Sequence, residues 1–292
     1  MGATPNLKAD VVGPALAAVD HPLGIREVEV LRRERLTPRM VRLVLGGDLE
    51  GSGWTARTPD EHVKLVFPDP DTGVTRHPVL DGDHLDWPKP FPPTREYTVR
   101  RYDAEAGEVW MDFVVHPGGL ASDWALSAEP GDRVWVAGPR SGHATPDAFT
   151  HRVVLADLTA LPAVARMLEE LPDGVTAQVA VLVPDAEEEQ ELAVREGVAL
   201  TWLHLDGPHG EHGFEPYLAS LDVPAGEPWT LWAAGEAGLL KPVRRWAKDH
   251  GLVNGRTADI SGYWKRGRTN EVTARRMITH RLAHLLHLPH QD

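Results

Sequence analysis

The chain has 292 residues, enough for two domains of ordinary size, and it contains no cysteine. This composition excludes internal disulfides, thiolate nucleophiles and cysteine-bound metal clusters, so redox chemistry must use a bound organic cofactor or a metal held by His or carboxylate. The 30 Lys and Arg against 43 Asp and Glu give a net charge of −13, which argues against a nucleic-acid-binding protein, because such proteins have a basic surface.

The hydropathy of the chain predicts no membrane segment. No apolar run approaches the roughly 18 residues that a membrane span needs. Residues 1–23 lack the basic-then-apolar order of a secretory signal, since Pro5, Asp10, Pro14 and Asp20 interrupt them. We therefore expect a cytoplasmic protein.

The first half of the chain is typical of an all-β domain. Short runs rich in Val, Tyr, Trp and Leu alternate with clusters of Gly, Pro and Asp, and many short strands at such spacing predict a barrel or a sandwich. A short helix is expected over 121–127. The expected strands are 26–31, 40–45, 62–67, 95–102, 108–116 and 133–137.

From residue 151 the pattern changes to alternating strands and helices, which predicts a parallel α/β sheet. The polar stretch 141–150 marks the boundary between the two halves. The acidic run Glu187–Glu189 is expected to be a solvated helix end. The expected strands are 153–156, 177–183, 199–205 and 229–234, and the expected helices are 162–171, 187–196 and 238–250.

An amphipathic helix is expected near the end of the chain, over 273–288. Its His280 and His284 are four residues apart, a spacing that can bind a metal. Because no carboxylate motif lies nearby, we favour a packing role for these side chains and predict no metal site.

The segment Arg95-Glu96-Tyr97-Thr98-Val99-Arg100 carries the first chemical signal. Along a strand, Arg95 and Tyr97 share one face and Thr98 points to the other. An Arg can pair with a diphosphate, a Tyr ring can lie against an isoalloxazine, and a Thr hydroxyl can bond a ring nitrogen. The alternative is a half-buried strand with a surface Arg.

The segment 112–125 carries the second signal, because a strand ends in Gly118-Gly119 and leads into a helix containing Ser122. Glycines let a phosphate approach the backbone, and the bare N–H groups of a helix N-terminus suit a diphosphate. The alternative is a plain glycine turn, with Ser122 near a helix cap and His116 as a structural histidine.

Together the two segments resemble the siderophore-interacting protein family, the FAD-binding ferric-siderophore reductases of the ferredoxin-reductase-like superfamily. The resemblance runs in the family's order and covers roughly four-fifths of the chain. Its later blocks are Gly131-Asp132, Gly138-Pro139-Arg140, Asp157-Leu158-Thr159-Ala160-Leu161-Pro162-Ala163, Trp232-Ala233-Ala234-Gly235-Glu236 and Tyr263-Trp264-Lys265-Arg266-Gly267.

The resemblance implies a β plus α/β fold. An N-terminal antiparallel β-barrel that binds FAD would occupy 25–145. A parallel-sheet α/β domain that binds the nicotinamide would occupy 150–268, and a C-terminal helical extension would occupy 269–292.

The resemblance also implies roles for individual residues, with the flavin carrying the chemistry and no catalytic side chain. Arg95, Tyr97 and Thr98 would hold the flavin and its phosphates. From its place in the motif, Trp264 is either the side chain that covers the isoalloxazine or a buried core tryptophan. The cofactor would also be lined by residues of the helix turn, the domain junction and the nicotinamide site. These further residues are His116, Ala121, Ser122, Thr159, Gly235 and Glu236.

The implied activity is electron transfer from NADPH or NADH to the ferric iron of a siderophore, which releases Fe(II) in the cytoplasm. An anionic siderophore needs local positive charge, and the resemblance assigns it to Lys64, Arg140 and one of Lys265 or Arg266. The second half lacks a complete Gly-x-Gly-x-x-Gly fingerprint, so ferredoxin stays open as a donor beside the two nicotinamides. Leu120 stands where the family has Pro.

Two other functions remain open at this point. One is a general NAD(P)H-flavin reductase or diaphorase on the same scaffold, which would need no basic pocket. The other is a protein without enzymatic activity that keeps the barrel and binds a flavin or another ligand. A hydrolase is disfavoured because no Gly-x-Ser-x-Gly motif is present.

Overall fold

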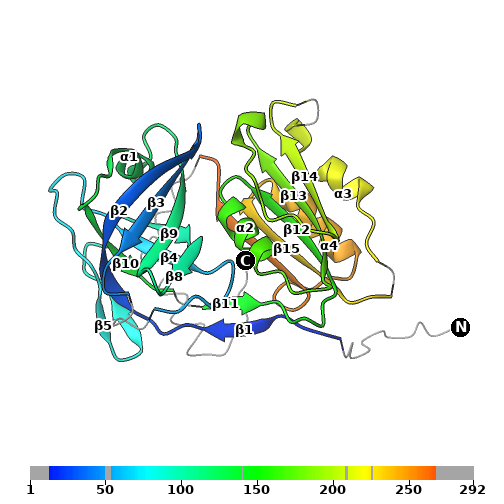
Figure 1. The fold of residues 1–292 in the computed structure, drawn as a ribbon, viewed down its shortest axis with the longest axis horizontal. Helices are drawn as coiled ribbons and strands as arrows, with labels where there is room; N and C mark the ends of the chain where they lie inside the picture. Colours follow the sequence, from blue (N-terminus) through cyan, green and yellow to red (C-terminus); the bar gives the residue numbers. More distant parts are fainter. Residues whose placement is uncertain (1–12, 50–53, 140, 208–209, 225, 268–292) are drawn as a thin grey trace, which may run out of the picture.

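Two sheets of different kinds stand side by side in the molecule (Figure 1). The computed structural model describes residues 13–49, 54–139, 141–207, 210–224 and 226–267. The first half forms a seven-stranded antiparallel sheet and the second half a five-stranded parallel sheet. The predicted fold class is therefore confirmed, while the helix expected over 273–288 lies outside the described residues.

The antiparallel sheet is curled so that its two edge strands are consecutive in the chain. Its order is β7-β4-β10-β2-β3-β9-β8, and two residues separate β7 from β8. Its inward side chains, such as Val28, Val30 and Leu43, are almost fully buried. The strands are β2 (Ile25–Thr37), β3 (Met40–Gly46), β4 (His62–Val66), β7 (Thr94–Thr98), β8 (Arg101–Asp103), β9 (Glu108–Val114) and β10 (Arg133–Ala137).

The corner between β7 and β8 differs from the single strand expected over 95–102. Val99 N donates to Glu61 O at 2.9 Å, and Arg100 N donates to Trp110 O at 2.9 Å. The backbone thus changes its partner from β4 to β9 within two residues, which ends one strand and begins the next. The short α1 (Leu120–Ser127) packs its small residues Ala121 and Ala125 on the core of this barrel.

The parallel sheet has the order β14-β13-β12-β15-β16, so the direction of winding reverses between β12 and β15. The helix α2 packs on one face of this sheet, and α3 and α4 pack on the other. Figure 1 shows α2 on the side nearer to the barrel. The elements are β12 (His151–Asp157), α2 (Leu161–Glu169), β13 (Thr176–Val183), β14 (Val198–His204), α3 (Glu215–Ser220), β15 (Trp229–Glu236), α4 (Leu240–Asp249) and β16 (Ala258–Trp264).

The connection between β13 and β14 corrects the helix expected over 187–196. Only a 3₁₀ helix, η1 (Ala186–Glu188), forms there. Glu188 is fully buried, not solvated as expected, and accepts from Thr37 Oγ1 of the barrel at 2.5 Å. Arg39 of the same barrel turn lies 3.5 Å from Asp185. Glu187 and Glu189 are exposed as expected, but Glu188 is held against the barrel, and the run does not continue as a helix.

The polar stretch expected as a boundary contains a strand instead of a plain linker. Here β11 (Ser141–Ala144) pairs antiparallel with β1 (Ala17–Asp20), and Figure 1 shows this ribbon running beneath both sheets. The sequence also gave no sign of the hairpin of β5 (Val79–Asp81) and β6 (His84–Asp86). The boundaries 25–145, 150–268 and 269–292 stay a prediction. In the described part of the chain, no helix has both the length and the apolar character to cross a membrane.

A buried ion pair joins the two halves of the molecule. Arg166 of α2 and Glu61 of the barrel approach to 3.1 Å, with side-chain exposures of 4% and 0%. The same guanidinium donates to Val99 O at 2.8 Å and to Glu170 Oε1 at 2.9 Å. Burial raises the pKa of Glu61, although the N–H of Arg57 and the charge of Arg166 act in the opposite direction. Neither charge could be left alone at low cost.

Replacing Arg166 by Met should therefore destabilise the protein strongly, because Glu61 would remain buried without its cation. We expect a loss of about 3–5 kcal/mol in the free energy of unfolding, measured by urea titration with tryptophan fluorescence. The double variant Glu61→Gln/Arg166→Met should lose less than Arg166→Met alone. The matched control is Arg101→Met, whose exposed pair with Asp103 should contribute about 1 kcal/mol or less. Equal losses for Arg166→Met and Arg101→Met would contradict this interpretation.

Candidate functional site

Three consecutive barrel residues bond to the second half of the chain, at the end of β7. Thr98 is hydrogen-bonded through its side chain to the hydroxyl of Tyr263 on β16. Val99 O accepts from Arg166, and Arg100 pairs with Glu169 through two hydrogen bonds of 2.9 and 2.5 Å. Burial, followed by the negative charge of Asp60, raises the pKa of Tyr263 well above its usual value. Tyr263 is therefore a neutral hydroxyl that fixes the orientation of Thr98.

On the other face of β7, Arg95 and Tyr97 lie half-buried. The Tyr97 ring is 4.1 Å from that of Phe113, which is itself packed near Trp124. Burial raises the pKa of Tyr97, so its hydroxyl stays neutral. Arg95 donates to Thr94 O at 2.8 Å, which leaves most of its five N–H groups for an anion. A planar aromatic cofactor and its phosphates match this pair of side chains.

The turn before α1 has the form expected for a diphosphate-binding loop. Gly118 has φ +73°, and the N-cap Gly119 gives the helix no side-chain cap. A Cβ on Gly119 would lie 2.4 Å from the His116 ring, so only glycine fits beneath that imidazole. The first N–H groups of α1 therefore have no side-chain acceptor at Gly119 and can bind an anion.

The hydroxyl of Ser122 bonds to the backbone of His116, and its expected contact with a diphosphate stays a prediction. It donates to His116 O at 2.8 Å and accepts from His116 N at 2.7 Å. Ser122 thus holds the turn in shape with both of its hydrogen bonds. Ala121 is buried beside it and contributes its backbone and its small size. The fit to a diphosphate rests on the backbone and on His116, with Ser122 in support.

At the carboxyl ends of β12 and β15, four predicted cofactor residues gather around one carboxylate, that of Asp157. Thr159 donates to Asp157 Oδ1 through its backbone N at 2.9 Å and its hydroxyl at 2.5 Å. Trp264 Nε1 and the backbone N of Glu236 each donate to Oδ2 at 2.8 Å. Gly235 lies against the same group, because a Cβ there would meet the carboxylate at 2.6–2.9 Å. Asp157 begins the 157–163 motif, but the sequence alone does not indicate a role for it.

Glu236 uses its carboxylate on backbone groups. Its Oε2 accepts from the N–H groups of Gly238 at 2.5 Å and Leu239 at 2.9 Å, just before α4, and Oε1 accepts from Arg266 N at 3.0 Å. Burial would raise the pKa of Glu236, but these donors and the charge of Arg266 outweigh it and lower the pKa below its usual value. Glu236 therefore orders the loop at this edge of the sheet.

The predicted basic group is only partly described. Lys64 on β4 forms a cross-strand ion pair with Glu96 on β7. Lys265 and Arg266 follow directly after β16 and are exposed. The bond between Thr98 and Tyr263 brings the end of β16 to the end of β7, two residues along the strand from Glu96. Arg140 lies outside the described residues.

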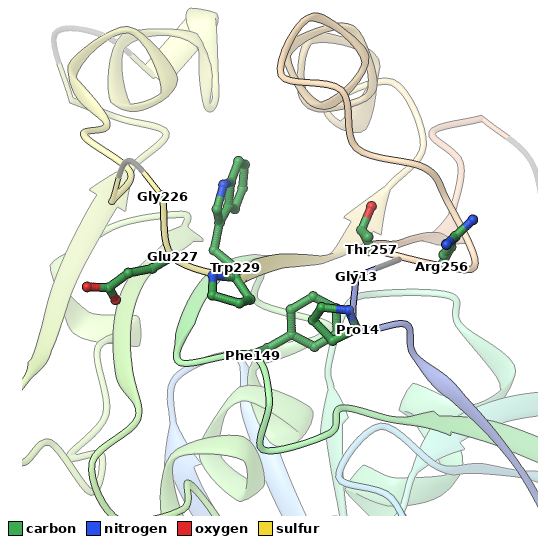
Figure 2. A pocket seen from close by; sticks show the side chains of 9 residues that line it. Gly13, Pro14, Phe149, Gly226, Glu227, Trp229, Arg256 and Thr257 are labelled. Atoms are coloured by element: carbon green, nitrogen blue, oxygen red, sulfur yellow. The ribbon is translucent and has the colours of Figure 1, made fainter. Parts of the chain in front are cut away.

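Two cavities lie away from the predicted cofactor residues. One of about 310 Å³ opens near Trp229, the first residue of β15 (Figure 2). Gly235 and Glu236 lie at the opposite end of that strand. Figure 2 shows Phe149 and Pro14 side by side there, while the indole of Trp229 points away from them. A second of about 210 Å³ lies between the two halves, with Asp60, Arg152 and Trp232 in its wall. Neither includes a predicted site residue.

The fold is that of the ferredoxin reductases. A ferredoxin NADP⁺ reductase from Neisseria gonorrhoeae with bound FAD and NADP superposes with a TM-score of 0.60 over 82% of this chain and 99% of that one. At 13% identity the similarity concerns the fold alone. An antiparallel barrel followed by a parallel sheet wound in both directions defines this class.

Closer similarity identifies the family. Residues 29–143 match the family model described as a siderophore-interacting FAD-binding domain, and residues 149–267 match that of siderophore-interacting protein. The NADPH-dependent ferric-chelate reductase of Escherichia coli is 37% identical over 78% of this chain and 88% of its own length. A siderophore utilization protein from T. fusca is 44% identical, with a TM-score of 0.81 over 88% of this chain and 98% of its own. The chain belongs to the siderophore-interacting protein family, as its motifs predict.

Replacing Gly235 by Ala tests the packing around Asp157. Gly235 has φ +147°, and its new Cβ would overlap the buried carboxylate, so we expect a loss of about 2–4 kcal/mol in stability by urea titration. Gly107→Ala is the control for backbone strain alone, since Gly107 has φ +66° with nothing within 4 Å of a Cβ. It should cost about 1–2 kcal/mol. A Gly235→Ala protein as stable as Gly107→Ala would refute the tight contact.

Proposed function

We propose that this chain is an FAD-dependent reductase that passes electrons from NADPH or NADH to the ferric iron of a siderophore. The observation that carries the proposal is the meeting of the barrel strand β7 with the carboxyl edge of the parallel sheet at Thr98 and Tyr263. Ligands of open α/β sheets bind at this edge, at the reversal of strand order. A donor bound there would lie beside a flavin on β7.

The residues present fit FAD. Arg95 and Tyr97 offer a guanidinium and an aromatic face on one side of β7, and Thr98 offers a hydroxyl held by Tyr263. The glycine turn below His116 and the first N–H groups of α1 would bind the diphosphate. We assign Ala121 and Ser122 to the support of that turn. When bound, FAD supplies the conversion between a two-electron hydride donor and a one-electron acceptor such as Fe(III).

The residues around Asp157 would receive the nicotinamide. Thr159, Gly235, Glu236 and Trp264 lie at the ends of β12, β15 and β16, where the winding of the sheet reverses. We propose Trp264 as the side chain that covers the flavin face until the nicotinamide enters. The proposal places the protein in the cytoplasm, where reduced nicotinamide is available, and a reduced ferredoxin is the competing donor.

The substrate is proposed to be an anionic ferric siderophore bound by Lys64, Arg140 and Lys265 or Arg266. Ferric iron prefers the hard oxygen donors of catecholates and hydroxamates, whereas ferrous iron binds them less tightly, so reduction releases the metal. The relatives in Escherichia coli and T. fusca, whose names refer to a ferric chelate and to siderophore use, support this choice. The chain's own contribution is to bind and orient the two partners and to surround the iron chelate with positive charge.

The defining experiment is an anaerobic absorbance titration of the purified protein. We expect a yellow protein whose flavin bands bleach on addition of NADPH or NADH and return when a ferric siderophore is added, with Fe(II) appearing in a ferrous trap. If only reduced ferredoxin bleached the flavin bands, ferredoxin and not a nicotinamide would be the electron donor. Equal rates with free FMN and ferric siderophores would indicate a general flavin reductase, and failure to take up FAD would refute the proposal.

Charge variants test the basic group. Lys64→Ala and Arg266→Ala should each raise the KM for an anionic ferric siderophore about two- to tenfold, the effect of losing one partly exposed charge contact. Glu96→Gln should lower that KM, because it releases Lys64 from its ion pair. Arg133→Ala is the matched control. Arg133 pairs with Glu27 and begins β10, whereas Ala137, opposite Lys64, ends it. Unchanged saturation curves for both Lys64→Ala and Arg266→Ala would remove this group from the site.

A further inference from the structure

Asp157 occupies the position in the parallel sheet where a ligand is expected. It is the last residue of β12, and the neighbouring strand β15 ends in Gly235 and Glu236. The strand order reverses between these two strands, and ligands of open α/β sheets bind at the carboxyl ends of the strands at such a reversal. The side chain is nevertheless buried, with 6% of the residue exposed. A carboxylate is costly to bury, so its partners define its state.

The carboxyl group of Asp157 is the acceptor in all four of its hydrogen bonds. Thr159 provides two to Oδ1, at 2.9 and 2.5 Å, and Trp264 Nε1 and Glu236 N provide two to Oδ2, at 2.8 Å each. An ionised carboxylate has about four acceptor positions. A protonated carboxyl would instead donate a hydrogen bond at one of them. Burial raises the pKa of Asp157, and the donors from Thr159 and Trp264 act against that rise. Three of the four donors are N–H groups, which can only donate, so the geometry favours the ionised form even though burial raises the pKa of Asp157.

No cation balances this charge within the described residues. None of the lysines and arginines there forms an ion pair with Asp157, and the groups that favour its ionised form are Thr159, Trp264 and the backbone of Glu236. These neutral hydrogen-bond donors stabilise the carboxylate, but they do not neutralise its charge. A negative charge so fixed, at the carboxyl edge of the sheet, favours a ligand that carries or acquires a positive charge there.

We infer that Asp157 is a positioning residue whose fixed negative charge favours the oxidised nicotinamide ring over the reduced ring. This rests on the proposed function, in which a dihydronicotinamide loses a hydrogen with both electrons of its C–H bond to the flavin. The nicotinamide is thereby oxidised to a cation and the flavin is reduced. Through its four bonds Asp157 holds Thr159, Trp264 and the 235–236 segment in place, and through its charge it stabilises the cationic product.

The chain offers a matched control for this role. Asp259 lies on β16, the strand that ends in Trp264, and is also largely buried, with 14% of its side chain exposed. Its carboxylate accepts from Ser261 and lies 3.2 Å from His143, toward β11. Asp259→Asn therefore removes a carboxylate from β16, the strand of Trp264, without changing a hydrogen bond of Asp157.

The experiment compares the dissociation constants of oxidised dinucleotide and its unreactive tetrahydronicotinamide analogue, measured by calorimetry on the FAD-loaded protein. Wild-type protein should bind the oxidised form more tightly than the analogue. Asp157→Asn should weaken binding of the oxidised form by about tenfold more than that of the analogue, as expected for loss of a charge contact in a buried site. Asp259→Asn should leave the ratio of the two constants unchanged. FAD content and the urea midpoint of each variant provide the readout of folding.

The outcomes separate the inference from the proposed function. Equal weakening of both ligands in Asp157→Asn would reduce Asp157 to a structural role and overturn the inference alone. A wild-type preference for the neutral analogue would also overturn it, and that measurement does not depend on whether Asp157→Asn folds. Wild-type protein that binds neither dinucleotide, while its flavin is reduced by ferredoxin, would refute the nicotinamide donor and the inference with it.

Discussion

The attachment of one barrel corner to the second half of the chain is the constraint on which the site depends. Thr98, Val99 and Arg100 follow one another, and each bonds to a different group on α2 or β16. The middle bond belongs to Arg166, whose buried charge is paired with Glu61 of the same barrel. Because an unpaired charge in that place would cost several kcal/mol, the two sheets cannot separate there without breaking the whole group. The strand carrying Arg95 and Tyr97 is thereby fixed against the edge of the sheet carrying Asp157.

Carboxylates order the loops at that edge, where many nucleotide-binding sheets use glycines. The chain lacks a complete Gly-x-Gly-x-x-Gly. Asp157 and Glu236 instead accept hydrogen bonds from backbone N–H groups at the strand ends and just after them. This has a consequence for phosphate binding. Glu236 takes the N–H groups of Gly238 and Leu239, just before α4, so the start of that helix is already occupied by a negative charge. A dinucleotide bound at this edge would have to place its phosphates away from the start of α4.

Local patterns predicted those parts of the molecule whose structure depends on near neighbours. The alternation of strands and helices after residue 151 predicted the parallel sheet, and the glycines before α1 predicted the turn that Gly118 and Gly119 form. The motif order predicted the family. Arg95 and Tyr97 were expected to share a face of β7 with Thr98 on the other, and Thr98 indeed turns to Tyr263.

The remaining features depend on partners far away in the sequence. Glu188 was expected in solvent because its neighbours are acidic, yet it is buried by Thr37, 151 residues away. The ribbon of β1 and β11 joins residues more than a hundred positions apart, and neither strand has a strong pattern of its own. The expected ligand contacts of Ser122 and Glu236 stay predictions, and the structure adds that both side chains bond to nearby backbone groups. Asp157 could have been found from one signal, a lone acid ending a buried apolar strand.

The acidity of the whole chain does not conflict with an anionic substrate, because distance decides which charges count. At physiological ionic strength an exposed charge is screened over about 8 Å, so most of the net −13 has little influence on a ligand at the end of β7. In the proposed basic group, Lys64 is paired with Glu96, and Glu236 lies beside Arg266. An anionic chelate would have to displace Glu96 from this ion pair to gain the full charge of Lys64. Exchange of one anionic partner for another costs less than the exposure of a bare cation, so at the proposed site Glu96 would set how strongly an anion must bind to enter.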